Sequence, residues 1–123
     1  MKRDMDLIRL LLIQQETGES PPELAKYSQD LAVYNVALMK DARLIEAEIA
    51  EGPDGSPIGA VIIRMTWAGH DFLDAARDDT VWRKAKDNLL RPGVSWTFDL
   101  LKQTLKALAE QQLARIGLPG FDQ

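Results

Sequence analysis

The chain of 123 residues contains no cysteine, a single histidine and no long apolar run. The absence of cysteine excludes disulfides, thiolate zinc sites and cysteine nucleophiles. With one histidine, a Ser-His-Asp relay has to use His70 or not exist. Uncharged apolar runs such as residues 10–13 are far short of the roughly 20 residues that cross a bilayer, and the amino terminus lacks a signal-peptide pattern. We therefore expect a cytoplasmic protein that makes no membrane contact.

What is present is the composition of one small globular protein. Hydrophobic residues make up 46% of the chain and charged residues 28%. A chain of this size buries about two-thirds of the surface that its unfolded form exposes, which is enough for a self-sufficient core. The net charge of −4 gives no overall electrostatic support to the binding of a polyanion.

Apolar spacing and capping residues predict a mainly helical chain with two strands. We expect helices over 5–16 and 23–27, and a third helix from Ser28 or Asp30 to Ala42 or Arg43. Two strands follow, over 44–51 and 58–65. A helix then runs from Thr66 to Leu89, with a break or bend near 78–80 where Thr80 is a candidate cap, and a last helix is expected over 95–116.

The two predicted strands are separated by a segment rich in turn residues. The first strand alternates apolar and acidic residues, and Gly52-Pro-Asp-Gly-Ser-Pro joins it to a second strand rich in β-branched residues. Three helices followed by a hairpin are typical of a winged helix-turn-helix, in which the third helix is the recognition element and the hairpin is the wing. We expect an α+β fold of this kind, with a winged-helix domain over 1–91 and an added C-terminal helix within 92–123.

Two segments resemble the signatures of a known family. "MKRDMDLIRLLL" at the start and "MTWAGHDFLDAARD" over 65–78 are similar to those of the bacterial and phage-associated domain of unknown function 2513, and the resemblance extends from residue 1 to about residue 115. It implies a winged-helix-like bacterial protein in the cytoplasm and carries over no catalytic residue. "VALMKDARLI", residues 36–45, resembles the end of a recognition helix and the first wing strand, although Arg43 occupies a position where glycine is common.

The second signature surrounds His70, and two interpretations of it compete. In the structural one, Thr66 caps a helix, Gly69 allows close backbone approach and Trp67 covers an edge of the sheet. In the chemical one, His70 and Asp74 begin a metal site or an acid-base pair, but no third ligand has suitable spacing. The structural interpretation is favoured, and we expect neither an enzyme nor a metal or cofactor site.

The predicted recognition helix and wing raise the question of DNA binding. Residues 29–64 contain three basic and six acidic side chains, a net charge of −3 that repels phosphates. The side chains of this region that suit base edges or phosphates are Gln29, Tyr34, Asn35, Lys40 and Arg64. These positions are the candidate DNA-binding residues, and the alternative is that they are ordinary polar positions of an exposed face.

A second basic group is a weaker candidate for nucleic acid. It consists of Arg77, Arg83, Lys84, Lys86 and Arg91, with Trp82 and Trp96 near it in the sequence. Basic residues beside an aromatic ring can hold a backbone and a stacked base. The alternative is a solvated helix with a tryptophan packed beneath it, since five acidic residues in 65–91 cancel the charge.

The last predicted helix has an apolar stripe about five turns long. We expect it to pair with a second copy in a homodimer through Phe98, Leu101, Leu105 and Leu108, unless it folds back onto the first helix.

Two function classes remain: a DNA-binding or regulatory protein, and a protein-interaction module whose acidic wing meets a basic partner.

Overall fold

The computed structural model describes residues 1–115, which divide into two compact units between Leu73 and Asp74. In chain order the elements are α1 (Met5–Thr17), the 3-10 helix η1 (Pro22–Lys26), α2 (Gln29–Asp41), β1 (Ile45–Glu51), β2 (Pro57–Met65), α3 (Trp67–Ala76), α4 (Asp79–Leu89) and α5 (Phe98–Arg115). The fold is therefore mainly helical with one antiparallel hairpin, an α+β, winged-helix-like arrangement, as the sequence predicts. No helix of residues 1–115 is long and apolar enough to cross a membrane.

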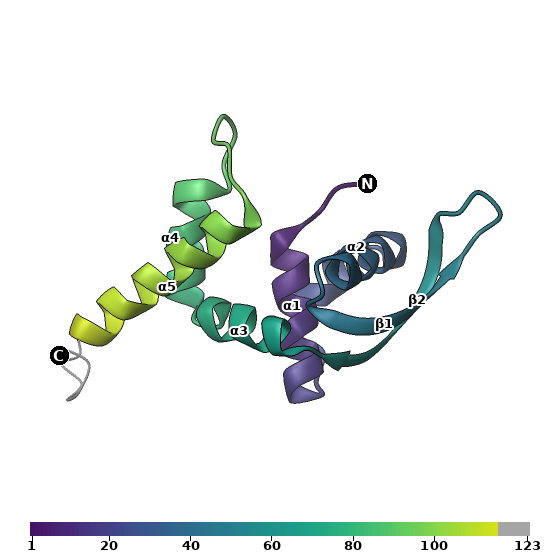
Figure 1. Cartoon of the computed structure of the whole chain (residues 1–123), viewed down its shortest axis with the longest axis horizontal. Coiled ribbons are helices and arrows are strands. Elements are labelled where there is room, and N and C mark those ends of the chain that lie inside the picture. Colours follow the sequence, from purple (N-terminus) through teal and green to yellow (C-terminus); the bar gives the residue numbers. More distant parts are fainter. Residues whose placement is uncertain (116–123) are drawn as a thin grey trace. The chain divides into compact units, whose positions relative to one another are not determined.

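The first unit contains α1, η1, α2, the hairpin and the start of α3. Helix α2 packs against α1 and against both strands, and the tip of the hairpin extends past α2 (Figure 1). The core of this unit lies between one side of the helices and the inner face of the hairpin. Its buried apolar residues include Leu7, Ile8, Leu11, Leu12, Val33, Val36, Met39, Leu44, Ile45, Ala47 and Met65.

The predicted ends of α1 and α2 are confirmed, whereas the helix expected over 23–27 is the 3-10 helix η1. The Asp4 carboxylate caps α1 by accepting a hydrogen bond from the Leu7 amide at 3.0 Å, and Gly18 ends that helix in the left-handed conformation. The Ser28 hydroxyl caps α2. Arg43 adopts a φ of +61° after α2, so the left-handed turn forms there although the residue is not glycine.

The second unit contains the rest of α3 together with α4 and α5, which pack against each other (Figure 1). The boundary between the units falls inside α3. The expected break near 78–80 is present, but its cap is Asp78, whose carboxylate accepts from the Val81 amide at 2.9 Å, and not Thr80. The Asp78 carboxylate also accepts a hydrogen bond from Gln112 of α5 at 3.2 Å.

Candidate functional site: the wing and the corner behind it

The second signature segment forms a corner in which the start of α3 contacts the chain between α2 and β1. The Thr66 hydroxyl donates to the Arg43 carbonyl at 2.6 Å and accepts from the Gly69 amide at 3.1 Å. The Thr66 amide donates to the Leu44 carbonyl at 3.0 Å. One threonine thus caps α3 and also ties the end of the hairpin to its beginning.

Gly69 completes this corner because no other residue fits there. A Cβ at this position would lie 2.1 Å from the Leu44 carbonyl oxygen and 2.6 Å from the Met65 side chain. The expectation that Gly69 allows close backbone approach is confirmed. We define the corner as Arg43, Leu44, Thr66 and Gly69.

The chemical interpretation of this signature depends on His70 and Asp74. His70 is exposed. Asp74, one turn further along α3, forms an ion pair with Arg77 at 2.9 Å. Among residues 1–115 no three histidine, aspartate or glutamate side chains are grouped closely enough to hold a metal ion. The expectation that Trp67 covers an edge of the sheet is wrong, because this side chain is 83% exposed.

Asn35 does not belong to an exposed recognition face, which corrects its assignment as a DNA-binding residue. It is completely buried. Its carbonyl oxygen accepts from the Asp4 amide at 2.8 Å, and its nitrogen donates to the Leu31 and Lys2 carbonyls at 3.0 and 3.3 Å. Asn35 therefore fixes the segment that precedes α1, which explains why the first signature begins before its helix.

The other candidate DNA-binding residues are spread along α2 and the hairpin. Gln29 and Lys40 are exposed at opposite ends of α2, about 16 Å apart at 1.5 Å per residue. Tyr34 is half-buried between them. Arg64 lies on the outer face of the hairpin, where its guanidinium makes hydrogen bonds of 2.9 and 2.7 Å to both carboxylate oxygens of Glu46.

That ion pair has an electrostatic consequence for the wing. The hydrogen bond to Glu46 and the charge of its carboxylate raise the pKa of Arg64 above its usual value. Glu46 therefore offsets the charge of the one basic side chain of the strands, and the pair as a whole offers a phosphate no net positive charge.

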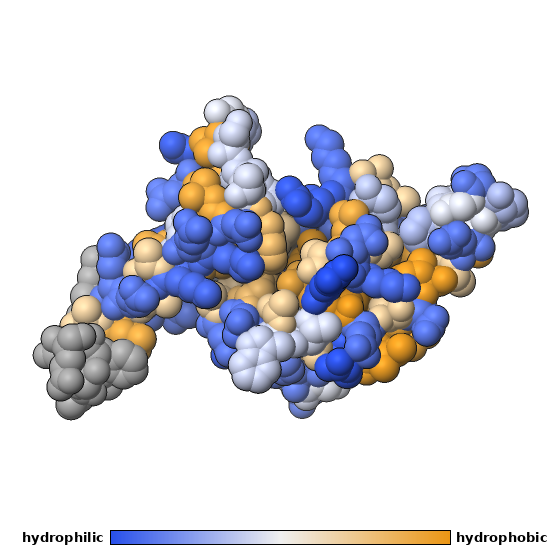
Figure 2. Space-filling view, in the orientation of Figure 1, coloured by the Kyte–Doolittle hydropathy of each residue, from blue (hydrophilic) through white to orange (hydrophobic). Residues whose placement is uncertain are grey.

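The outer face of β2 has a feature that the sequence analysis did not single out: it exposes large apolar side chains. Ile58 is 67% exposed, Val61 66% and Ile63 56%, and Trp67 follows directly after the strand. We call these four residues the wing surface. Figure 2 shows apolar surface along the hairpin, next to hydrophilic side chains.

Two irregularities in the strand pairing account for the exposure of Ile63 and Ile58. Glu46 pairs with Arg64, but the next residue, Ala47, pairs with Ile62, so that Ile63 is an extra residue; Ile58 is skipped in the same way near the turn. Such bulges redirect side chains relative to strict alternation. A usable sequence signal was the unbroken run Val61-Ile62-Ile63, since a hairpin with one covered face requires only every second residue to be apolar.

The basic group of the second unit lacks an exposed aromatic partner in α4. Trp82 is only 4% exposed, so its ring is part of the interior and does not offer a face to a base. This agrees with the alternative of a solvated helix over a packed tryptophan. Trp96 is half-buried.

The apolar stripe of α5 is largely used within the chain. Leu101 and Leu105 are completely buried in the single chain, where α5 packs on α4, and Phe98 and Leu108 are half-buried. Leu101 and Leu105 cannot face a second copy while α5 stays in this position, so their assignment to a dimer interface is wrong. Homodimerisation as such stays a prediction.

With this geometry in view, comparison with known proteins identifies the family. A family model described as "Hypothetical protein (DUF2513)" matches residues 2–95. The chain belongs to the DUF2513 family. The match includes the corner, the wing and α4 but ends before α5, whereas the resemblance was expected to reach about residue 115. Both signature segments of this DUF2513 protein have structural roles, in the segment before α1 and in the corner.

A relative of this DUF2513 protein is found in Haemophilus influenzae. That protein, described as uncharacterized, is 29% identical over 120 residues, which cover 93% of this chain and 100% of the relative. No solved structure matches the chain.

Proposed function

We propose that this DUF2513 protein is a cytoplasmic protein-interaction module without catalytic activity, and that its wing surface binds an apolar segment of a partner flanked by basic side chains. The observation that carries this proposal is the concentration of exposed apolar side chains in one short stretch. Six large hydrophobic residues are exposed among residues 1–115, and four of them lie within residues 58–67. Single exposed apolar residues are ordinary, whereas a group of them is typical of an interaction site.

The composition of the group supports protein as the ligand. Trp67 is the most exposed of the four, and tryptophan is enriched among residues that dominate binding energy at protein interfaces. Val61 and Ile63 lie on a strand, which holds them in fixed positions before binding. The partner therefore meets a rigid apolar surface and loses little of its affinity to ordering this side of the interface.

The charge of the first unit indicates what flanks the apolar part of the partner. Residues 1–73 contain twelve carboxylates and seven basic side chains, a net charge of −5. Glu48 lies directly opposite Val61 across the hairpin, beside the wing surface. A partner with lysine or arginine next to its apolar residues complements this arrangement, and such complementarity raises the association rate and the specificity.

The competing function is DNA binding through α2 and the wing, for which exposed Gln29 and Lys40 are the remaining support. Three observations count against it: Asn35 is buried, Arg64 is paired with Glu46, and the unit is strongly acidic. Phosphate contacts supply much of the affinity of DNA-binding proteins, and here the field of the unit opposes them.

Affinity capture with a matched pair of variants tests the proposal. The Val61→Ser, Ile63→Ser double variant removes the centre of the wing surface, and Gln103→Ser, Gln111→Ser alters exposed positions of α5 as the control. We expect wild type and control to retain the same protein from a lysate of the source cell and the wing variant to lose it.

The captured protein then has to bind in purified form. We expect the wing variant to weaken that complex at least about tenfold, or 1.4 kcal/mol, and added salt to weaken the wild-type complex. Equal capture by both variants contradicts the proposal. So does gel-shift binding of DNA at low salt that Gln29→Ala and Lys40→Ala abolish.

A further inference from the structure

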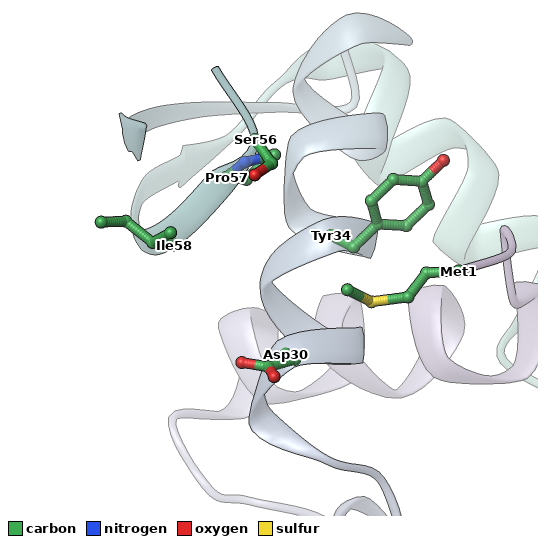
Figure 3. Close-up of a pocket in the computed structure, with 6 residues that line it drawn as sticks. All are labelled: Met1, Asp30, Tyr34, Ser56, Pro57 and Ile58. Carbon is green, nitrogen blue, oxygen red and sulfur yellow. The ribbon is translucent and has the colours of Figure 1, made fainter. Parts of the chain in front are cut away.

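A hollow lies where the first half of α2 faces the tip of the hairpin. It has a volume of about 370 Å³ and is lined by Met1, Asp30, Tyr34, Ser56, Pro57 and Ile58 (Figure 3). Pockets that hold whole small molecules range from about 300 to 1,000 Å³, so this one is at the small end. Its size suits one long side chain better than a cofactor.

Two residues that line the hollow, Asp30 and Tyr34, contribute a carboxylate and a phenol from α2, and Ser56 adds a hydroxyl from the turn. Asp30 and Tyr34 are four residues apart, which places them one above the other on the helix. Within residues 1–115 the Asp30 side chain has no ion pair or hydrogen bond, and neither has the Tyr34 hydroxyl. The carboxylate is exposed and the ring is half-buried. A cation that enters the hollow therefore meets walls that include the Asp30 carboxylate and the Tyr34 ring.

The other walls are formed by Met1, Ser56, Pro57 and Ile58. Pro57 and Ile58 come from the start of β2, and the Met1 side chain lies near the Tyr34 ring (Figure 3). Ile58 lines the hollow and is also one of the four residues of the wing surface.

We propose that the hollow receives an arginine side chain of the protein partner. The guanidinium pairs with the Asp30 carboxylate and stacks on the Tyr34 ring, and its methylene groups lie against Pro57 and Ile58. Arginine fits better than lysine because its planar cation both stacks on a ring and forms two parallel hydrogen bonds to a carboxylate. The net charge of −5 of the first unit favours a cation and excludes a phosphate. This inference rests on the proposed function, since it names the anchor residue of that partner.

The hollow can be tested without the partner by titrating the full chain with n-propylguanidinium chloride and following backbone amide signals by NMR. We expect saturable shifts at Asp30, Tyr34 and Ile58, at millimolar concentrations typical of such a small ligand. Neutral n-propylurea, which has the same shape, is expected to cause none of them. Equal shifts with both compounds, or none with the guanidinium, overturn the inference.

Variants of the two polar residues sharpen the test. Asp30→Asn and Tyr34→Ala are each expected to weaken guanidinium binding at least about tenfold, and Tyr34→Phe to retain it, since the ring is what stacks. Asp41→Asn, exposed at the other end of α2, is the matched control and is expected to bind as wild type does. Unchanged binding by Asp30→Asn contradicts the inference.

The failure of this inference is distinguishable from the failure of the proposed function. The Val61→Ser, Ile63→Ser variant is expected to bind n-propylguanidinium normally while it loses the protein partner. If the partner binds the wing surface and the guanidinium does not bind the hollow, the interaction module stands and its arginine anchor is refuted.

Discussion

The two faces of β2 are similar in composition and differ in what covers them. On the inner face Met65 is 8% exposed and packs into the core, and the corner with Thr66 and Gly69 follows directly. On the outer face Val61 and Ile63 are more than half exposed. Folding explains an apolar residue on the inner face, because burial of a large side chain contributes about 1.5–3 kcal/mol. Folding does not explain an apolar residue on the outer face, where the side chain stays exposed and can contact a partner.

The largest expected effect tests the inner side at the corner. Gly69→Ala places a methyl group on the Leu44 carbonyl and is expected to lower the free energy of unfolding by about 3 kcal/mol or to prevent folding. Gly59→Ala in β2 is the matched control, since a Cβ there meets nothing closer than 3.7 Å. Urea denaturation followed by circular dichroism measures both. If the two variants are equally stable, the corner does not hold the hairpin.

The next comparison sets the two faces of β2 directly against each other. Met65→Ala removes a buried side chain and is expected to cost about 2–3 kcal/mol, whereas Ile63→Ala, two residues away, is expected to change the free energy of unfolding by no more than about 0.5 kcal/mol. Thermal or urea unfolding of the pair decides the matter. A loss at Ile63 as large as that at Met65 shows that the outer face is needed for folding.

A smaller effect separates the buried and exposed polar residues of α2. Asn35→Ala leaves the Asp4 amide without its acceptor and is expected to cost about 2 kcal/mol. Gln29→Ala, on the exposed first turn, is expected to stay within about 0.5 kcal/mol of wild type. If the two variants are equally stable in urea and both lose DNA binding, Asn35 belongs to a recognition face.

The smallest expected effect is at the turn between the strands. Hydrogen bonds from the Ser56 hydroxyl and amide lower the pKa of the Asp54 carboxyl below its ordinary value of 3.8. A lowered folded-state pKa stabilises the turn above pH 3.8, and this contribution is lost as the pH falls through the folded pKa. NMR titration of the Asp54 side chain is expected to show the lowered value in wild type and a higher one in Ser56→Ala. An identical titration in both proteins contradicts this account of the turn.

Local signals were sufficient for most of the fold. Asp4 and Ser28 cap their helices as predicted, and the dense turn residues after β1 place the hairpin correctly. The end of α2 also forms as expected although Arg43 has to adopt a left-handed backbone there. In each case the information lies within a few residues of the chain.

The site was harder to predict because it depends on contacts between distant segments. Nothing local shows that Asn35 faces the segment before α1, since asparagine is usually exposed on helices. The register irregularity at Ile63 changes which residues of β2 face outward, and the sequence pattern alone does not locate it. Leu101 likewise lies in a stripe whose spacing fits both a dimer interface and a contact between helices of one chain. Only the position of α4 decides between the two.

Site-specific photo-cross-linking in the source cell tests the central claim most directly. A photoreactive amino acid replaces Ile63 on the wing surface or Gln29 at the exposed end of α2 in otherwise identical chains, and the adducts are identified by mass spectrometry. The account predicts a protein adduct at position 63 whose linked peptide is apolar and contains arginine or lysine. A DNA adduct at position 29 with no protein adduct at position 63 would contradict it.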